Sequence, residues 1–167
     1  MKKKMEKAFN KQVNAELYSS YLYLSMESYF QSVSLTGFAK WMRGQVQEEM
    51  FHGIKIYDYI HERGGRAQFD AIDKPVSEWN SPLVAFEHIL AHEQKVTELI
   101  NDLIDVSLDV RDHAAKAFLD WFIIEQVEEE STVGEVVDRL RLIGDDSSGL
   151  FLLDSELGKR VFTLPAK

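Results

Sequence analysis

Four long segments of this chain repeat apolar residues at alternating steps of three and four, the spacing of helices that bury one stripe inside a bundle. The segments span about 4–33, 35–63, 82–108 and 111–142. Near its middle each stripe is interrupted by a carboxylate, and these are Glu16, Glu49, Glu93 and Glu129. Because helices of similar length lie side by side with their midpoints level, the four acidic side chains are expected to meet in one buried layer.

The lengths of the connections predict how the helices are ordered. Only a few residues separate the first two segments and the last two, so each pair is expected to form an antiparallel hairpin. The link from Gly64 to Ser81 can span a whole helix at about 3.3 Å per residue, and such a crossover leaves the second and third helices parallel. Its apolar side chains are expected to hold the link on the bundle surface: Phe69, Ile72, Val76 and Trp79.

A short amphipathic piece at about 147–159 follows the fourth segment. Its leucines recur on one face, which predicts a fifth helix that packs on the bundle. The sequence therefore predicts an all-α fold, an antiparallel four-helix bundle over about 4–143 with a long crossover between helices two and three and a short C-terminal fifth helix. These elements are expected to form a single domain that spans residues 1–167.

Composition restricts the partners that the chain can have. The 28 acidic residues outnumber the 19 basic ones, so the net charge is -9, which disfavours nucleic acid and anionic membrane surfaces and suits cations. Cysteine is absent, which excludes disulfides and thiolate metal sites. No apolar run approaches the roughly 18 residues of a membrane span, and no secretory signal follows the basic N-terminus, so a cytoplasmic location is expected.

The buried acidic layer is energetically costly. An unpaired buried carboxylate costs several kcal/mol, and carboxylates that face one another also repel. Lys and Arg are absent from the stripe positions between Phe38 and Leu140, and protonation of three or four carboxylic acids at neutral pH would need very large pKa shifts. Bound cations are the remaining way to stabilise the layer, so the sequence predicts a metal centre.

The residue types limit which metal fits. His52 lies three residues after Glu49 and therefore faces the same way on a helix. Together with Glu16 this pair could hold one ion, while Glu93 and Glu129 could hold a second ion that Glu49 bridges to the first. Carboxylates with a single imidazole are hard ligands, unlike the sulfur-rich or histidine-rich sets typical of zinc. Two residues are expected beside this layer, Tyr23 and Gln126.

Four motifs carry a resemblance to a known family. "NAELYSSYLY", "QEEMFH", "HEQ" and "EQVEEE", in this order and spacing, resemble the bacterial and archaeal non-haem ferritins, and the similarity covers essentially the whole chain. The resemblance implies a four-helix bundle with a short C-terminal helix and a hollow shell of twenty-four subunits. It further implies oxidation of Fe(II) with dioxygen or peroxide and storage of ferric mineral inside the shell.

The resemblance also implies roles for individual residues. The residues implied for the paired iron site are Glu16, Glu49 and His52 at one iron and Glu49, Glu93 and Glu129 at the second. Gln126 stands where the family keeps a residue close to the second iron and to bound dioxygen. Tyr23 and Trp121 match aromatic residues near the centre that are associated with electron supply or protection against radicals. A third iron site is implied at Glu48, Glu125 and Glu128, which share Glu129.

Haem is not expected as a cofactor. Met50 stands where bacterioferritins place a haem-ligating methionine, but those proteins carry a second E-x-x-H motif where this chain reads Gln126-Val127-Glu128-Glu129. We therefore interpret Met50 as a packing residue. The four histidines outside the stripes are interpreted as surface residues: His61, His88, His92 and His113.

Two other functions are compatible with the same residues. One is a peroxidase or oxygenase that acts on a small substrate with the same di-iron centre, which would require a substrate pocket and an electron donor. The other is a helical scaffold or metal buffer whose central layer binds Zn(II) or Mn(II) without turnover. The ferroxidase interpretation is preferred because the motifs that resemble the ferritins occur in combination and in order along the chain.

Overall fold

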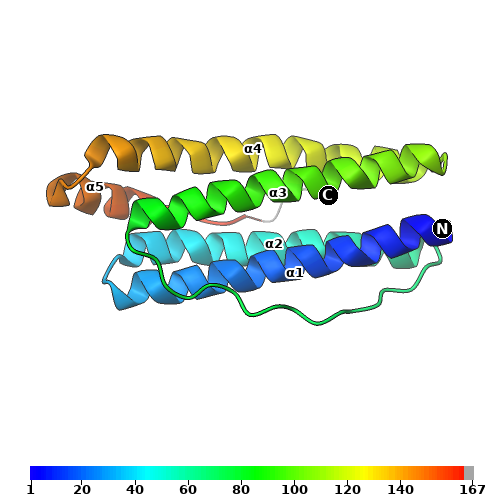
Figure 1. The fold of residues 1–167 in the computed structure, drawn as a ribbon, viewed down its shortest axis with the longest axis horizontal. Coiled ribbons are helices and arrows are strands. Elements are labelled where there is room, and N and C mark those ends of the chain that lie inside the picture. Colours follow the sequence, from blue (N-terminus) through cyan, green and yellow to red (C-terminus); the bar gives the residue numbers. More distant parts are fainter. Residues whose placement is uncertain (164–167) are drawn as a thin grey trace.

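Five helices make up most of residues 1–163, which are the residues that the computed structural model describes. Their bounds are α1 (Lys3–Ser32), α2 (Thr36–Glu62), α3 (Pro82–Asp109), α4 (His113–Ile143) and α5 (Ser147–Leu157). The four long helices lie side by side, and α5 lies at one end of the bundle (Figure 1). The predicted all-α fold is confirmed, and the expected helix bounds differ from these by only a few residues.

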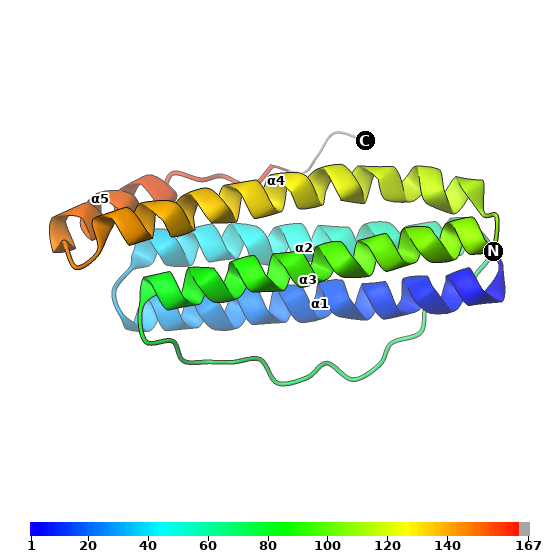
Figure 2. The same cartoon turned by 45° about the horizontal axis from the view of Figure 1, so that its top comes forward.

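The order of the helices also agrees with the prediction. Helices α1 and α2 form one antiparallel hairpin and α3 and α4 form another, while the link between α2 and α3 runs the length of the bundle (Figure 2). Both hairpins turn through a non-glycine residue with positive φ, Ser34 at 61° and Arg111 at 55°. The long crossover leaves α2 and α3 parallel, so the midpoints of all four helices share one level.

The crossover is attached to α1 mainly by hydrogen bonds and not by its own apolar side chains. Asn10, Asn14 and Ser25 of α1 donate to backbone carbonyls of the crossover at 3.1, 3.3 and 2.7 Å. The expectation of apolar anchoring is correct for Trp79, which is buried. The other three side chains are largely exposed, namely Phe69 (62%), Ile72 (41%) and Val76 (48%), and of these the Phe69 ring still stacks on Tyr57 of α2. Polar side chains of α1 therefore hold the crossover by its backbone carbonyls, where the sequence predicts apolar contacts.

The apolar core is divided into two clusters at different heights of the bundle. One cluster includes Phe30, Phe38, Phe86 and Leu140. The other includes Phe9, Ile56, Ile100 and Leu119. The positions between them on the four long helices are occupied by buried polar side chains, so the hydrocarbon core is interrupted at mid-height as the stripes predict.

Helix α5 supplies the N-terminal cap of α2. The residue before α2 makes no side-chain cap, but Asp154 of α5 accepts hydrogen bonds from the backbone N–H groups of Gly37 and Phe38 at 2.8 and 3.0 Å. These bonds satisfy donors that would otherwise have no partner at the start of a helix. The approach is so close that a Cβ atom on Gly37 would lie 1.7 Å from the backbone oxygen of Asp154.

Replacing Gly37 with alanine is therefore expected to displace α5 and to lower the free energy of unfolding by about 2 kcal/mol, the cost typical of overpacking. Gly134→Ala is the matched control, because a Cβ there meets nothing within 4 Å and alanine favours a helix interior by about 0.5–1 kcal/mol. Thermal melting of the two variants checks the prediction. Equal melting temperatures for both variants would contradict the docking of α5 at Gly37.

Candidate metal centre

The five predicted ligand residues lie in the polar layer and come from all four long helices. They are Glu16 of α1, Glu49 and His52 of α2, Glu93 of α3 and Glu129 of α4. None of their side chains is more than 5% exposed. Burial of four carboxylates at one level is the arrangement that the interrupted stripes predict.

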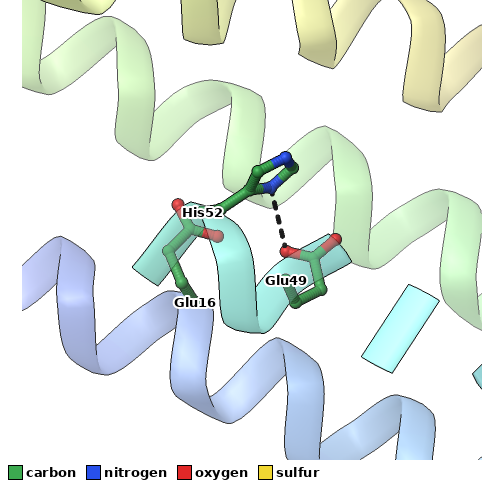
Figure 3. A group of neighbouring side chains, drawn as sticks. All are labelled: Glu16, Glu49 and His52. Atoms are coloured by element: carbon green, nitrogen blue, oxygen red, sulfur yellow. Dashed lines mark ion pairs between the residues drawn. The ribbon is translucent and has the colours of Figure 1, made fainter. Parts of the chain in front are cut away.

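Three of these residues form a compact group. The ligand atoms of Glu16, Glu49 and His52 all lie within 4.8 Å of one another, and His52 Nδ1 lies 3.5 Å from a Glu49 oxygen. Figure 3 shows the carboxylates and the imidazole directed toward one another from α1 and α2. Two ligands on one ion at about 2.1 Å lie at most about 4.2 Å apart, so small side-chain adjustments would close the group around a cation. Within residues 1–163 this is the one acidic or histidine triad of such closeness.

Two buried atoms of this group have no hydrogen-bond partner among the described residues. They are Glu16 Oε2 and His52 Nε2. A buried polar atom without a partner costs about 1–3 kcal/mol, so such atoms are rare unless a ligand, ion or water satisfies them. An unsatisfied carboxylate oxygen and an imidazole without a partner at one nitrogen, both beside the Glu49 carboxylate, fit a bound cation.

The other carboxylates are held by neutral donors. The Tyr23 hydroxyl donates to Glu93, and Gln126 Nε2 donates to the second Glu93 oxygen at 3.3 Å. Gln45 Nε2 donates to Glu129 at 2.9 Å. The expected positions of Tyr23 and Gln126 beside the layer therefore agree with the structure. The amide of Gln45 lies in the stripe of α2, but no sequence pattern pairs it with Glu129.

Gln12 is the neutral hydrogen-bond donor to Glu16. Its Nε2 donates to Glu16 at 2.8 Å from one helical turn earlier on α1. Sequence reasoning missed this residue, although the separation of four positions from a buried carboxylate is a signal that could have identified it. Each of three carboxylates thus has an uncharged donor that can hold it when no cation is bound.

Burial changes the protonation of the layer. It raises the pKa of Glu16 from 4.5 to about 7 and that of Glu129 to about 8, and it raises the pKa of Glu49 well above its usual value. The neighbouring Glu93 and Glu16 carboxylates add to the increase at Glu49. Burial also lowers the pKa of His52 to about 4, so its imidazole is neutral at pH 7 and able to bind a metal.

These directions correct one step of the sequence argument. Protonation of these carboxylates requires large pKa shifts, and the pKa values of Glu16 and Glu129 do rise far enough for both groups to be substantially protonated near neutral pH. Protons therefore stabilise the metal-free layer. Divalent cations would displace those protons, so metal affinity should increase with pH.

The three residues expected at a third site lie beside the layer on α2 and α4. Burial raises the pKa of Glu48 and of Glu125, and in both cases the Glu128 carboxylate adds to the increase, so the three acidic groups are electrostatic neighbours. The side chain of Glu48 is only 15% exposed. Arg160, from the segment after α5, donates to Glu48 at 2.8 Å. Sequence reasoning did not predict this partner.

Trp121 and Tyr23 lie close to the polar layer, whereas Met50 lies on the outer side of α2. The Trp121 ring lies 5.4 Å from the His52 ring, and Tyr23 is fully buried, so both are close to the layer. Met50 is 41% exposed, which is contrary to its interpretation as a packing residue within this chain. The exposed part of Met50 lies on the outer side of α2, where another molecule could cover it.

Two of the four histidines expected at the surface are partly buried. His88 accepts a hydrogen bond from Trp79 Nε1 at 3.0 Å, and His92 Nε2 lies 2.8 Å from Ser19 Oγ. His61 and His113 are exposed as expected. The stripe pattern missed the first two because their partners lie outside the inner seam.

A bundle with buried carboxylates from four helices and a Glu-x-x-His pair resembles the carboxylate-rich helix bundles that hold metal ions in their core. Comparison with known proteins makes this assignment specific. The Ferritin family, described as a ferritin-like domain, matches residues 6–143. The chain therefore belongs to the ferritin family.

Individual relatives are similar over nearly the whole chain. A bacterial non-heme ferritin of Bacteroides fragilis is 45% identical over 157 residues, which cover 94% of this chain and 98% of the relative. One of Staphylococcus saprophyticus is 43% identical over 162 residues, which cover 97% of each. A structure of Archaeoglobus fulgidus ferritin engineered to a closed form has a TM-score of 0.97 at 50% identity, covering 98% of this chain and 99% of that one.

Proposed function

We propose that this chain stores iron, as its membership of the ferritin family indicates, and that it is a ferroxidase. In this proposal Fe(II) is oxidised at a paired site inside each subunit, with dioxygen or peroxide as acceptor. The ferric product is stored as mineral inside a hollow multi-subunit shell. The observation that carries the proposal is the buried group of Glu16, Glu49 and His52 with its two unsatisfied polar atoms.

The proposed site binds two iron ions as substrate. Glu16, Glu49 and His52 hold the first, and Glu49, Glu93 and Glu129 hold the second. Glu49 is proposed to serve both ions because Glu16, Glu93 and Glu129 are all near enough to raise its pKa. To bind the second ion, Glu93 and Glu129 exchange hydrogen bonds from neutral donors for the cation.

The chemistry of the pair is a two-electron transfer. Two Fe(II) ions give one electron each, and dioxygen with two protons accepts them to form hydrogen peroxide and two Fe(III). The protein fixes the ions side by side and supplies negative charge that stabilises Fe(III) more than Fe(II). Carboxylic acids that lose their protons on Fe(II) binding are a local source of those protons.

The roles of the neighbouring residues belong to the same proposal. Gln126 lies beside the second ion, and Tyr23 and Trp121 supply an electron or limit radical damage. The hydrogen bonds of Tyr23 and Gln126 to Glu93 support their places beside the second ion, and the Trp121 ring lies 5.4 Å from the His52 ring. A third iron is proposed to bind at Glu48, Glu125, Glu128 and Glu129, on the basis of their electrostatic proximity.

Assembly into a homo-oligomer is supported by an apolar surface on α2. Met50, Ile54 and Tyr57 are exposed at helical spacings of four and three, so they lie on one face of the helix. Tyr57 also stacks on the exposed Phe69 ring of the crossover, at 6.2 Å between centroids. Such a surface is typical of a subunit interface. A shell of twenty-four subunits, each a single domain spanning 1–167, remains part of the proposal.

Membrane association has no support in the helices. None of those in residues 1–163 combines the length and apolar character that a bilayer crossing requires. A cytoplasmic location remains a proposal, and so does the lack of nucleic-acid partners, which rests on the net charge of -9.

Aerobic addition of Fe(II) to the metal-free protein tests the function. Absorbance should report fast oxidation, and gel filtration should recover a very large soluble particle that holds far more iron than the binding sites can account for. Turnover of a small substrate without mineral would favour a peroxidase or oxygenase. Binding without oxidation would favour a metal buffer.

A further inference from the structure

The segment after α5 returns along the bundle and places one arginine against the acidic side chains of α2. Arg160 Nη2 donates to Glu48 Oε2 at 2.8 Å, and Nη1 donates to the amide oxygen of Gln45. The guanidinium carbon lies 4.6 Å from the centre of the Trp41 ring, a cation–π distance. Figure 2 shows this C-terminal stretch passing beside α4 and α2, away from the crossover. Three separate contacts therefore define the position of the guanidinium.

The amide of Gln45 connects Arg160 to the ligand layer. Gln45 is fully buried, and its Nε2 donates to Glu129 at 2.9 Å while its oxygen accepts from Arg160. Because a guanidinium only donates hydrogen bonds, Arg160 fixes the amide oxygen toward itself and the NH₂ group toward Glu129. Arg160 thus positions a donor on a proposed iron ligand that it does not touch.

Arg160 also forms an ion pair with Glu48, a carboxylate assigned to the third iron. Glu48 carries the Arg160 ion pair, while Glu125 and Glu128 lie close enough to influence Glu48 or each other electrostatically. A guanidinium contributes a single positive charge, whereas a divalent cation contributes two and can contact several carboxylates at once. The Arg160 side chain is 26% exposed, so the ion pair is accessible to a competing ion.

We propose that Arg160 is a tethered cation that holds Glu48 and orients Gln45 until a metal ion displaces it, and that it thereby sets the affinity of the third iron site. The inference rests on the proposed function, because it concerns the third site of that proposal. Arg160 acts as a positioning residue. Its displacement frees both Glu48 and the amide that holds Glu129, so filling of the third site is coupled to rearrangement next to the second ion.

Anaerobic calorimetric titration of the full-length, metal-free assembly with Zn(II) tests this inference. Arg160→Gln should tighten the weakest binding step roughly fivefold, the size expected for loss of one competing partly exposed ion pair, while the two tighter steps keep their stoichiometry. Glu48→Gln should remove the weakest step. Arg160→Lys, which retains the charge but not the two-pronged contact, should fall between wild type and Arg160→Gln. Arg141→Gln is the matched control, because Arg141 pairs with Glu87 on an exposed surface.

Hydrogen exchange of the backbone over residues 158–163 gives a readout that a merely structural arginine would not change. Saturating Zn(II) should increase exchange of this segment in the wild type and leave it unchanged in Arg160→Gln, where it is already high. If Arg160→Gln leaves the weakest step unchanged or weakens it while Glu48→Gln removes it, the inference is overturned and the proposed function stands. If Glu48→Gln also leaves all steps unchanged, the third site and the inference both fail. If the wild-type protein does not show the two tighter binding steps at all, the proposed function is rejected.

Discussion

Glu49→Gln is expected to slow the initial oxidation of Fe(II) by at least about 100-fold, since the loss of a direct ligand exceeds the 10–100-fold effects of outer-shell changes. Glu49 is the residue assigned to both ions, so a neutral amide at this position weakens the binding of each ion and removes the carboxylate that they share. Its side chain is 2% exposed and touches the group that also contains Glu16 and His52. Stopped-flow absorbance after mixing with aerobic Fe(II) measures the rate.

The substitution separates chemistry from folding. Burial and neighbouring carboxylates raise the pKa of Glu49 well above its usual value, which favours the uncharged acid, and glutamine is an uncharged side chain of nearly the same shape. Glu49→Gln should therefore fold and assemble normally. Glu62→Gln, an exposed position on the same helix, is the matched control and should oxidise iron at the wild-type rate. A wild-type initial rate in Glu49→Gln would reject the paired-site assignment.

The stability of the metal-free protein is expected to fall by about 2 kcal/mol between pH 6.5 and 8, which follows from integration over the raised pKa values of two carboxylates. The pKa values of Glu16 and Glu129 rise from 4.5 to about 7 and about 8. The folded chain then binds more protons than the unfolded chain in this range, so the stabilisation is lost as the pH rises. For a chain of this size the melting temperature should fall by roughly 5–8 °C.

The window above pH 6.5 isolates the carboxylates from the histidine. Burial lowers the pKa of His52 from 6.5 to about 4, so this group destabilises the folded state mainly as the pH falls from 6.5 toward 4, and its effect above pH 6.5 is only about 0.4 kcal/mol. The double variant Glu16→Gln with Glu129→Gln should show a much smaller pH dependence. Melting in pH-matched buffers under chelator measures both proteins, and a flat profile for the wild type would contradict the protonated layer.

A divalent cation should reverse this loss. Anaerobic Zn(II) or Fe(II) at about 100 times its dissociation constant adds about 2.7 kcal/mol per site, because it binds the folded state. The increase in melting temperature should be larger at pH 8 than at pH 6.5, since fewer protons compete with the metal at the higher pH. An unchanged melting temperature at pH 8 would count against cation binding in the layer.

The stripes of the four long helices predicted the fold and the ligand layer because both depend on local spacing. The carboxylate of each helix sits where three-four periodicity places an inward residue, and the equal lengths of the helices bring these positions to one level. Glu49 and His52 were recognisable as a pair because a separation of three residues fixes their common direction. No knowledge of distant contacts was needed for these conclusions.

The interactions that escaped the sequence join residues far apart in the chain. Arg160 contacts Glu48 across 112 positions, and Asp154 caps Gly37 across 117. Neither contact leaves a pattern in the local sequence, because the position of the segment after α4 depends on how α5 docks on the bundle. The protonation of Glu16 also escaped, since its pKa reflects the depth of burial, which the residue type does not reveal.

Anomalous diffraction from crystals soaked anaerobically in Fe(II) would show directly whether the buried carboxylates bind iron. We expect one iron peak among Glu16, Glu49 and His52 and a second among Glu49, Glu93 and Glu129, with the Tyr23 and Gln45 hydrogen bonds lengthened. Crystals that bind iron only at the protein surface, with the buried carboxylates still held by neutral donors, would contradict it.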